Sequence, residues 1–188
     1  MGENAHVPRA DGPGVGEILD VLAAGAAVPL LPGLDVSQLD HALQTAALLV
    51  RARPGDQELA VAGLLHDLGH LLPGSTDETH AELAAWAVAP ALGERVARAV
   101  GLHVEAKRYL VTVEAGYGGL LGADSVASLA RQGGAMSPAE AEAFLATPGA
   151  PDAVALRRAD DAAKEEHVPV STLDEWAPVL RRRVRSVS

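Results

Sequence analysis

The chain has 188 residues, enough for one domain with a substantial core and barely enough for two. Its net charge of −10 argues against nucleic acid or an anionic membrane surface as a partner, and the absence of cysteine excludes disulfides, thiolate metal sites and cysteine nucleophiles. Apolar residues make up 48% of the chain but aromatic residues only 3%, so the core must consist of Ala, Leu and Val, which favours packed helices over a β-sandwich.

The first part of the chain predicts three helices after a polar arm. Residues 1–13 are rich in Gly and Pro without any period, and we expect a disordered N-terminal arm there. Residues 14–24 predict a short helix, followed by the apolar loop AVPLLPG. From Asp35 the apolar residues recur at helical spacing up to Pro54, and Asp56 can cap a further helix that ends near Gly74. No signal peptide or membrane-spanning stretch is found, so we expect a soluble cytoplasmic protein.

The second part of the chain predicts helices throughout. One covers residues 78–88 and stops at Pro90, and the next covers residues 93–103. Residues 117–132 are partly helical and end at two glycines, and a capping box starts another helix at Ser137. The last two helices are expected at residues 151–165 and 173–185. The sequence therefore predicts one all-α domain over residues 14–188, built as a helical bundle.

The histidines are the most informative residues. His6 and His167 lie in polar surroundings, but the other five lie on helical segments among Ala and Leu. His66 and Asp67 interrupt the apolar run LAVAGLLHDLGH, where burying an imidazole and a carboxylate costs several kcal/mol unless something compensates for both. A bound cation would do so. Any one of these histidines by itself, such as His41, is more often an ordinary core or surface residue.

The ordered set is more specific than any of its members. It combines four imidazoles with two carboxylates, spread over several helices: His41, His66, Asp67, His80, His103 and Asp160. These donors suit iron, manganese, zinc or cobalt rather than Cu(I). Six protein ligands are too many for one catalytic ion with open positions and about right for two ions, with Asp67 as the bridging carboxylate.

Several segments of the chain resemble one family. They are QLDHALQ (38–44), LLHDLGH (64–70), HAELAA (80–85), HVEAKRYLV (103–111), ARQGGAM (130–136) and LRRADDAAK (156–164). The chain is similar to the HD-domain mixed-valent di-iron oxygenases of the PhnZ type, relatives of myo-inositol oxygenase. These enzymes use O2 to cleave the C–P bond of 1-hydroxyphosphonates, releasing phosphate and a carboxylic acid. The resemblance implies an organophosphonate substrate and an Fe(II)/Fe(III) cofactor.

The resemblance also implies a role for each matching residue. One iron would be held by His41, His66, Asp67 and Asp160, and the other by His80 and His103, with Asp67 bridging. Asp161 is the neighbouring alternative to Asp160, and the alignment of RRADDAAK favours Asp160. The substrate would be bound by the residues at the family's anion-binding positions: His70, Lys107, Ser125, Gln132 and Arg157. Asp67, His70 and Lys107 are the expected catalytic residues. Without the resemblance, Lys107 would be interpreted as part of an exposed basic turn after a helix.

One stretch departs from the family. Relatives place a Tyr and an amine-binding Glu shortly before the first metal-binding histidine, whereas this chain has VPLLPGLDVSQ (28–38). A lid lined by Leu30, Leu31 and Leu34 cannot pair with an ammonium group, so it favours a substituent that is small, neutral or hydrophobic. The alternative is that Asp35, or an acid from another helix, replaces the Glu and the substrate is an amine as in the relatives.

Two other functions use part of the same pattern. An HD phosphohydrolase would share His41, His66, Asp67 and Asp160 but would not need the KRYLV and QGGAM segments. A non-enzymatic helical module that keeps a relic metal site is the second alternative, and the complete ligand set argues against it. The sequence gives neither the oligomeric state nor the exact phosphonate.

Overall fold

The structure, a computed structural model, describes residues 12–187, with side chains described as far as residue 182. The arm predicted at residues 1–13 therefore lies almost wholly outside the described residues, as does His6. Within 12–187 the structure has no β-strand, only an isolated bridge between Pro29 and Ser37. The predicted all-α fold is confirmed.

Eleven α-helices and two short 3₁₀ helices make up the described chain. The α-helices are α1 (Val15–Ala24), α2 (Gln38–Ala52), α3 (Gln57–Leu65), α4 (His80–Leu92), α5 (Glu94–Gly101), α6 (His103–Val113), α7 (Tyr117–Leu120), α8 (Ala123–Arg131), α9 (Pro138–Ala146), α10 (Ala150–Ala162) and α11 (Leu173–Val187). The 3₁₀ helices are η1 (Gly25–Ala27) and η2 (Leu68–Leu71). None of these helices is both long and apolar enough to cross a membrane.

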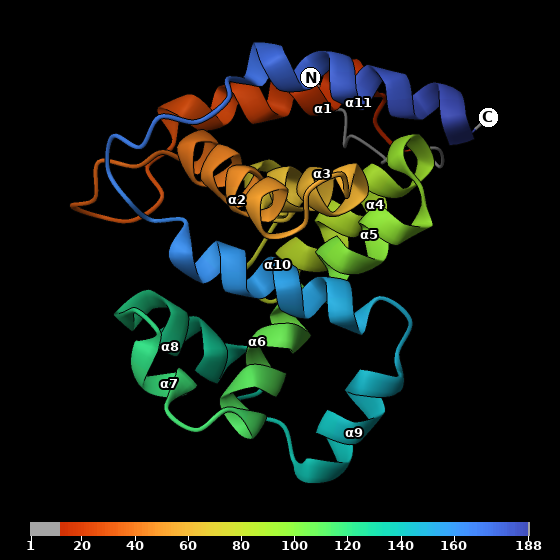
Figure 1. The fold of residues 1–188 in the computed structure, drawn as a ribbon. Helices are drawn as coiled ribbons and strands as arrows, with labels where there is room; N and C mark the ends of the chain where they lie inside the picture. Colours follow the sequence, from red (N-terminus) through yellow and green to blue (C-terminus); the bar gives the residue numbers. More distant parts are fainter. Residues whose placement is uncertain (1–11, 188) are drawn as a thin grey trace, which may run out of the picture.

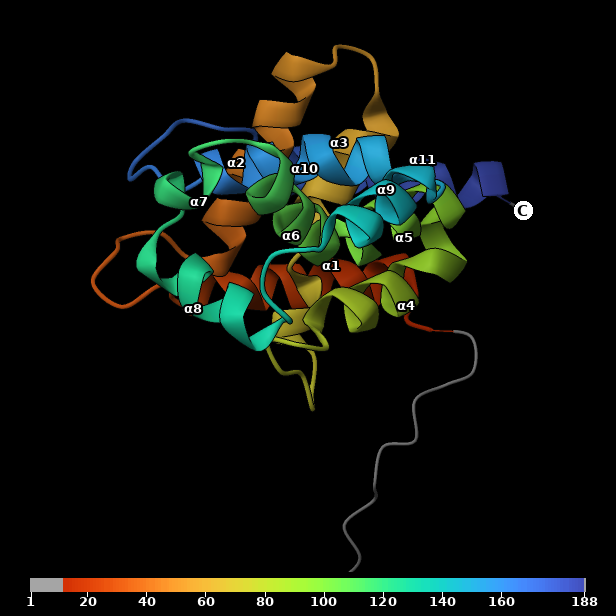
Figure 2. The same cartoon turned by 90° about the horizontal axis from the view of Figure 1, so that it is seen from below.

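The helices lie in three tiers (Figure 1). Helices α1 and α11 lie side by side at the top, α2 to α5 form the middle tier, and α6 to α9 lie below, with α10 between the middle and lower tiers. Seen from below, α6 to α9 lie on the near side of the bundle (Figure 2). Helix α10 packs against α2, α3 and α5 on one side and against α6 and α9 on the other, so it joins the two halves of the molecule.

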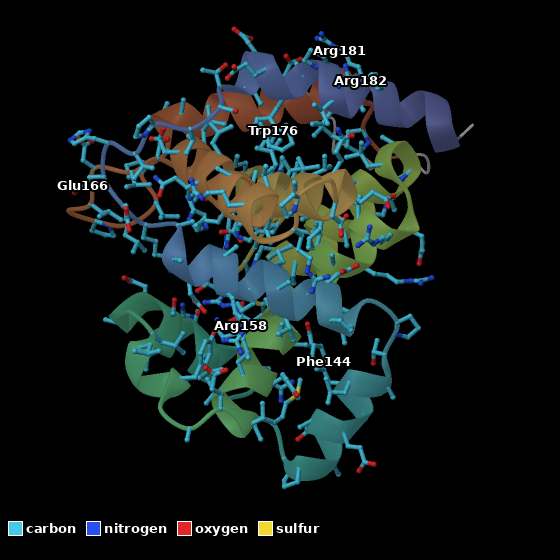
Figure 3. The ribbon with its side chains drawn as sticks, in the orientation of Figure 1. Phe144, Arg158, Glu166, Trp176, Arg181 and Arg182 are labelled. Atoms are coloured by element: carbon cyan, nitrogen blue, oxygen red, sulfur yellow. The ribbon has the colours of Figure 1, made fainter. Side chains whose placement is uncertain are left out.

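The core is divided in the same way. The main cluster of buried Ala, Leu and Val side chains comes from α1 to α5, α10 and α11, and Trp176 closes it beneath α11 (Figure 3). A much smaller cluster around Met136 and Phe144 joins α6, α9 and α10. Helix α8 contributes no buried side chain to either cluster. The lower tier is therefore held by far less apolar burial than the upper two.

Helix starts follow the predicted capping residues. The Asp56 carboxylate accepts a hydrogen bond from the Leu59 backbone N–H at 3.2 Å and begins α3. Ser137 and Glu140 form a reciprocal capping box at the start of α9. Both predictions are confirmed. These caps could be predicted because each bond joins residues that are close together in the sequence.

Four helix ends differ from the prediction; one is that of α10, which stops at Ala162 instead of residue 165. Helix α3 stops at Leu65 instead of near Gly74, and the chain turns at His66 and Asp67 into η2. A Cβ atom on Gly69 would lie 1.9 Å from the His80 carbonyl oxygen, so this glycine lets η2 lie directly against the start of α4. Helix α4 continues through Pro90 to Leu92, because a proline in the last turn removes one hydrogen bond while Leu92 is fully buried in the core.

The fourth difference concerns His103, which was expected to end a helix. Helix α5 ends at Gly101, and His103 instead begins α6. Lys107 consequently lies on the second turn of α6, with 3% of its surface exposed, and not in a basic surface turn. The structure overturns that interpretation of Lys107.

Candidate metal centre and substrate cavity

Four buried histidines share one orientation. In each, the ring Nδ1 lies 2.7 or 2.8 Å from a backbone carbonyl oxygen; the pairs are His41 with Ala163, His66 with Gly63, His80 with Asp77, and His103 with Val100. A carbonyl oxygen only accepts hydrogen bonds, so each Nδ1 carries the proton and each Nε2 presents a lone pair. This arrangement fixes ring and tautomer as in metal-bound histidines.

The four Nε2 atoms meet in two pairs on either side of Asp67. His41 and His66 Nε2 are 3.3 Å apart and lie 3.6 and 3.4 Å from Asp67 Oδ2. His80 and His103 Nε2 are 3.0 Å apart and lie 3.7 and 3.6 Å from the other carboxylate oxygen, Oδ1. One carboxylate therefore presents one oxygen to each histidine pair, which is the geometry of a bridging ligand.

Asp160 completes the first group. Its Oδ1 lies 3.2 Å from His41 Nε2 and 3.8 Å from His66 Nε2. The next residue, Asp161, turns away and accepts hydrogen bonds from Tyr117 and Arg157. The two neighbouring acids on α10 thus have different surroundings, and only Asp160 faces the histidines.

These residues fit a metal ion in each group. Ligand atoms bound at about 2.1 Å around one ion lie about 3 Å apart, which matches the separations of the Nε2 and carboxylate atoms here. In the His80–His103 pair, burial lowers the pKa of both rings, and two unprotonated nitrogens that face one another repel unless a cation lies between them. The donor set contains nitrogen and oxygen ligands only, which suits iron.

The electrostatics of the two groups differ. Burial lowers the pKa of the His66 imidazole, but the Asp67 and Asp160 carboxylates outweigh this and raise it to about 10. A cation bound there would replace that proton. Burial, reinforced by the neighbouring imidazoles of His66 and His80, lowers the pKa of His103 well below its ordinary value. His103 therefore presents the neutral ring that binds metals.

His70 also approaches this centre. Its Nε2 lies 3.9 Å from Asp67 Oδ1, and its ring stacks on that of His80 with centroids 4.0 Å apart. By distance alone His70 could serve as a ligand beside Asp67 and His80. His103 is the better partner, because its Nε2 faces that of His80 at 3.0 Å and lies closer to Asp67 Oδ1 than that of His70. It is also buried with an anchored Nδ1, whereas His70 is partly exposed.

A cavity of about 400 Å³ opens beside the two groups. Its walls come from α2, α6, α8, α10 and the segments after η1 and α10. All five predicted substrate contacts line it: His70, Lys107, Ser125, Gln132 and Arg157. So do His41, Asp67, His80, His103 and Asp160. A small molecule in this cavity can reach both histidine pairs.

Lys107 is the buried cation of the α6 wall. Its Nζ donates a hydrogen bond to Ser128 Oγ at 2.7 Å, and Ser128 in turn donates to the Ser125 carbonyl oxygen at 3.1 Å. Burial, with help from Arg157, lowers the pKa of Lys107 to about 8. Ser128 was not foreseen from the sequence, although its position one helical turn after Ser125 places it on the same face of α8.

Arg157 is held by two carboxylates. Its NH1 lies 2.8 Å from Asp160 Oδ2, and its NH2 donates to Asp161 Oδ1. Its Nε is buried without a hydrogen-bond partner among the described residues. The Tyr117 hydroxyl donates to the other oxygen of Asp161, and burial raises the pKa of this tyrosine. Tyr117, on α7, is a second residue that the sequence analysis did not single out.

The stretch 28–38, which differs from the family's pattern, forms part of the cavity wall. The Leu30 backbone N–H donates to the Val36 carbonyl oxygen at 2.8 Å, and Leu30 and Leu31 both line the cavity. The Asp35 side chain is 81% exposed and is not among the lining residues, while its backbone N–H donates to Glu166 at 3.0 Å. In this structure neither Asp35 nor Glu166 takes the place expected for an amine-binding acid.

Comparison with known proteins agrees with the resemblance. Residues 39–146 match the family model described as HD domain. The hydroxymethylphosphonate dioxygenase of Gimesia maris is 41% identical over 150 residues, which cover 75% of this chain and 74% of that protein. The glycine-betaine-forming 1-hydroxy-2-(trimethylamino)ethyl phosphonate dioxygenase of Leisingera caerulea is 29% identical over 160 residues, 81% of each chain.

A more distant similarity reaches inositol oxygenase 1 of Arabidopsis thaliana, which is 42% identical over 57 residues, 30% of this chain and 17% of that protein. The HD match covers more than half of the chain, and the Gimesia relative aligns over most of both proteins. The chain therefore belongs to the HD-domain family and, within it, to the oxygenases of the PhnZ type.

Proposed function

We propose that this oxygenase holds two iron ions and uses O2 to cleave the C–P bond of a 1-hydroxyphosphonate. The first ion is assigned to His41, His66, Asp67 and Asp160, and the second to Asp67, His80 and His103. The observation that carries the assignment is the pair of facing imidazoles on each side of Asp67, 3.3 and 3.0 Å apart, with every Nδ1 bound to a carbonyl oxygen. The names of the two phosphonate dioxygenases among the relatives support the reaction.

The overall reaction balances without a further reductant. A 1-hydroxyphosphonic acid, R–CH(OH)–PO3H2, and O2 give R–COOH and H3PO4, so the carbinol carbon is oxidised and O2 is reduced. One oxygen atom of O2 ends in the carboxylic acid and the other in phosphate. When bound, the two ions would supply the redox chemistry and the Lewis acidity that this reaction needs.

The residues of the chain bind and orient the substrate. Lys107 and Ser125 are assigned to the phosphonate oxygens, with Arg157 and Gln132 beside them on the cavity wall. His70 lines the cavity beside Asp67 and is assigned to accept the proton of the substrate hydroxyl at Nε2.

The lid predicts which phosphonate is preferred. Leu30 and Leu31 line the cavity and Asp35 is exposed outside it; besides the ligand group, the acids on the wall are Asp77, which pairs with Arg131, and Asp124 of α8. Burying an ammonium group against leucine without a counter-charge is costly. We therefore propose a substrate with a small, neutral or hydrophobic substituent, such as hydroxymethylphosphonate.

A spectroscopic and an enzymatic measurement test the proposal together. Protein purified in air and partly reduced should contain two irons per chain and give a mixed-valent Fe(II)/Fe(III) EPR signal. A panel of 1-hydroxyphosphonates, assayed for released phosphate, should favour hydroxymethylphosphonate over the 2-amino-1-hydroxyethyl compound. One ion per chain, with O2-independent hydrolysis of phosphate esters, would support the phosphohydrolase alternative. Preference for the amine, lost in Asp35→Ala, would refute the lid argument.

A further inference from the structure

The cations that line the cavity are not equally available to a substrate. There are four of them: Lys107, Arg131, Arg157 and Lys164. Arg131 donates to the Asp77 carboxylate. The guanidinium of Arg157 is paired with the carboxylates of Asp160 and Asp161, and its buried Nε has no hydrogen-bond partner among the described residues. Neighbouring carboxylates therefore largely neutralise the charge of both arginines, although Arg157 keeps N–H groups that can donate to an anion.

Lys107 is only partly available. It has one hydrogen bond to Ser128, and its burial lowers its pKa to about 8, so a fraction of the protein carries it without a charge near neutral pH. A phosphonate dianion presents three oxygens, each of which accepts more than one hydrogen bond. Arg157 is paired with two carboxylates. Lys107 and the Ser125 hydroxyl cannot by themselves supply all the hydrogen bonds that the phosphonate oxygens can accept.

Lys164 is the remaining cation. It lines the same cavity, is partly buried, and has no hydrogen bond or ion pair to any residue that the structure describes. It follows α10 by two residues, on the side of the cavity that faces α2 and the 28–38 stretch. Lysines on a solvated surface are commonly unpaired, so the absence of a partner alone would mean little.

The backbone around Lys164 is fixed on both sides. The carbonyl oxygen of the preceding residue, Ala163, accepts the hydrogen bond from His41 Nδ1 at 2.7 Å. The following residue, Glu165, is bound twice by the buried amide of Gln44, which donates to its carbonyl oxygen at 2.8 Å and accepts from its N–H at 3.2 Å. Both anchors lie on α2, one turn apart. Two side chains of α2 therefore fix the backbone on either side of Lys164.

A further contact ties the same segment to the lid. Glu166 accepts a hydrogen bond from the Asp35 backbone N–H at 3.0 Å, and it lies at the edge of the molecule where the two loops come together (Figures 1 and 3). The segment that carries Lys164 therefore contacts both the helix with the first metal ligand and the loop with Leu30 and Leu31.

We propose that Lys164 is a substrate-binding residue, which the clamp formed by His41 and Gln44 holds at the cavity so that its ammonium group pairs with the phosphonate. The proposal deepens the function proposed above and rests on it. Lys164 joins Lys107 as the second cation that binds the anion, while Arg157 acts mainly on Asp160 and Asp161.

The test compares three variants of the iron-loaded protein. Lys164→Gln removes the charge, Lys164→Arg keeps it, and Arg158→Gln is the matched control, because Arg158 is an exposed cation of α10 that pairs with Glu114 outside the cavity. Inorganic phosphate, measured by calorimetry, is the binding probe, and hydroxymethylphosphonate is the substrate. Iron content is measured for each variant.

We expect Lys164→Gln to raise the Kd of phosphate and the KM of the phosphonate about ten- to a hundredfold, with iron content unchanged. Lys164→Arg should restore most of the affinity, and Arg158→Gln should leave it within about twofold of the wild type, as expected for an exposed pair. Unchanged affinity in Lys164→Gln overturns the proposal. So does a loss that Lys164→Arg does not restore or that Arg158→Gln shares.

Failure of the C–P cleavage proposal can be distinguished from failure of the Lys164 proposal. If the wild-type protein released no phosphate from any 1-hydroxyphosphonate, the C–P cleavage proposal would fall. The phosphate-binding comparison between Lys164→Gln and the wild type would still decide whether Lys164 binds an anion.

Discussion

The two walls of the cavity are built in contrasting ways. The metal-ligand wall lies in the main core, where His41, His66 and His103 are almost completely buried and each ring is anchored to a backbone carbonyl. The wall formed by α8 and the residue after it contributes Ser125, Ser128 and Gln132 to the cavity, yet α8 has no buried residue, and Leu120 of the preceding α7 is 82% exposed. Side-chain hydrogen bonds, more than apolar burial, hold this second wall in place.

The contrast indicates that the first wall binds the metals and the second wall binds the substrate. The ligands of two metal ions must keep their positions within a few tenths of an ångström, which a close-packed core provides. A wall that admits and releases a small anion gains from lower local stability, and such regions open at lower free energy than the core. We therefore expect changes in the first wall to abolish metal binding and changes in the second to affect substrate binding with the metals retained.

The largest effect is expected from the residue shared by both metal groups. Asp67→Ala removes the carboxylate whose two oxygens face the two histidine pairs, so both ions should be lost, and activity with them. His80→Ala should empty mainly the second site. Iron analysis and EPR measure both outcomes. Full iron content in Asp67→Ala would contradict the bridging role, and loss of both ions in His80→Ala would contradict the independence of the first group.

A backbone contact gives the next largest effect. Gly69→Ala places a methyl group 1.9 Å from the His80 carbonyl oxygen in the present geometry, so η2 and the start of α4 must separate. Overpacking of this kind costs about 1–3 kcal/mol, and we expect a lower melting temperature and a weakened second metal site. Gly16→Ala in α1 is the control, because a Cβ there has no atom within 4 Å. Equal behaviour of the two variants would mean that this contact relaxes without cost.

Gly69 also illustrates what sequence could and could not predict. The metal candidates were found because an imidazole and a carboxylate inside an apolar helical run require compensation, and because their order resembles a known family. The capping residues Asp56 and Ser137 were found because their bonds are local. The break of the helix at His66 was missed, because it depends on the close approach of η2 to α4, residues that are distant in the sequence.

The same limit applies to the cavity. Lys107 appears exposed in the sequence, because its neighbours Arg108 and Tyr109 are polar, and only the packing of α6 against α10 buries it. Neither Tyr117 nor Gln44 is a metal-ligand type, and their partners, Asp161 and Glu165, are 44 and 121 residues away. Pairings across such separations follow from the tertiary arrangement of α10, which helical periodicity does not give.

Lys107 of α6, whose ammonium group donates to Ser128 of the second wall, should give an intermediate effect with a characteristic pH dependence. The pKa of Lys107 is lowered to about 8 by burial, so the free enzyme loses this positive charge as the pH rises through 8. Anion binding needs the charged form, and kcat/KM should therefore fall above about pH 8. Lys107→Arg should move this limb to higher pH, since arginine stays charged. Lys107→Ala should raise KM about ten- to a hundredfold. If kcat/KM of Lys107→Arg fell at the same pH as in the wild type, the fall would reflect the titration of another group.

The lowered pKa of Lys107 also makes the stability of the folded protein rise with pH. The pKa of Lys107 in the folded protein lies below its ordinary value of 10.5, so the unfolded chain binds the proton more tightly. Burial of the charged Lys107 lowers the free energy of unfolding by its full amount below pH 8, and this destabilisation disappears as the pH rises toward 10.5. Chemical denaturation of Lys107→Met and wild type should therefore converge with increasing pH over this range. A difference that stays constant would mean that Lys107 is protonated at the same pH in both states.

The smallest effect separates the two walls most clearly. Tyr117→Phe removes the hydroxyl that α7 donates to Asp161 and leaves the ring in place. Hydrogen bonds to charged groups contribute about 1.5–3 kcal/mol, and because α8 buries no side chain, loss of this bond should loosen residues 117–132 locally. We expect faster amide exchange there, a KM several times higher, and unchanged iron content. Glu114→Gln, which weakens only the exposed pair with Arg158, is the control. If Tyr117→Phe lost iron while exchange in α8 stayed the same, Tyr117 would act on Asp160 through Arg157 and Asp161, and the second wall would not be the independent unit that its packing indicates.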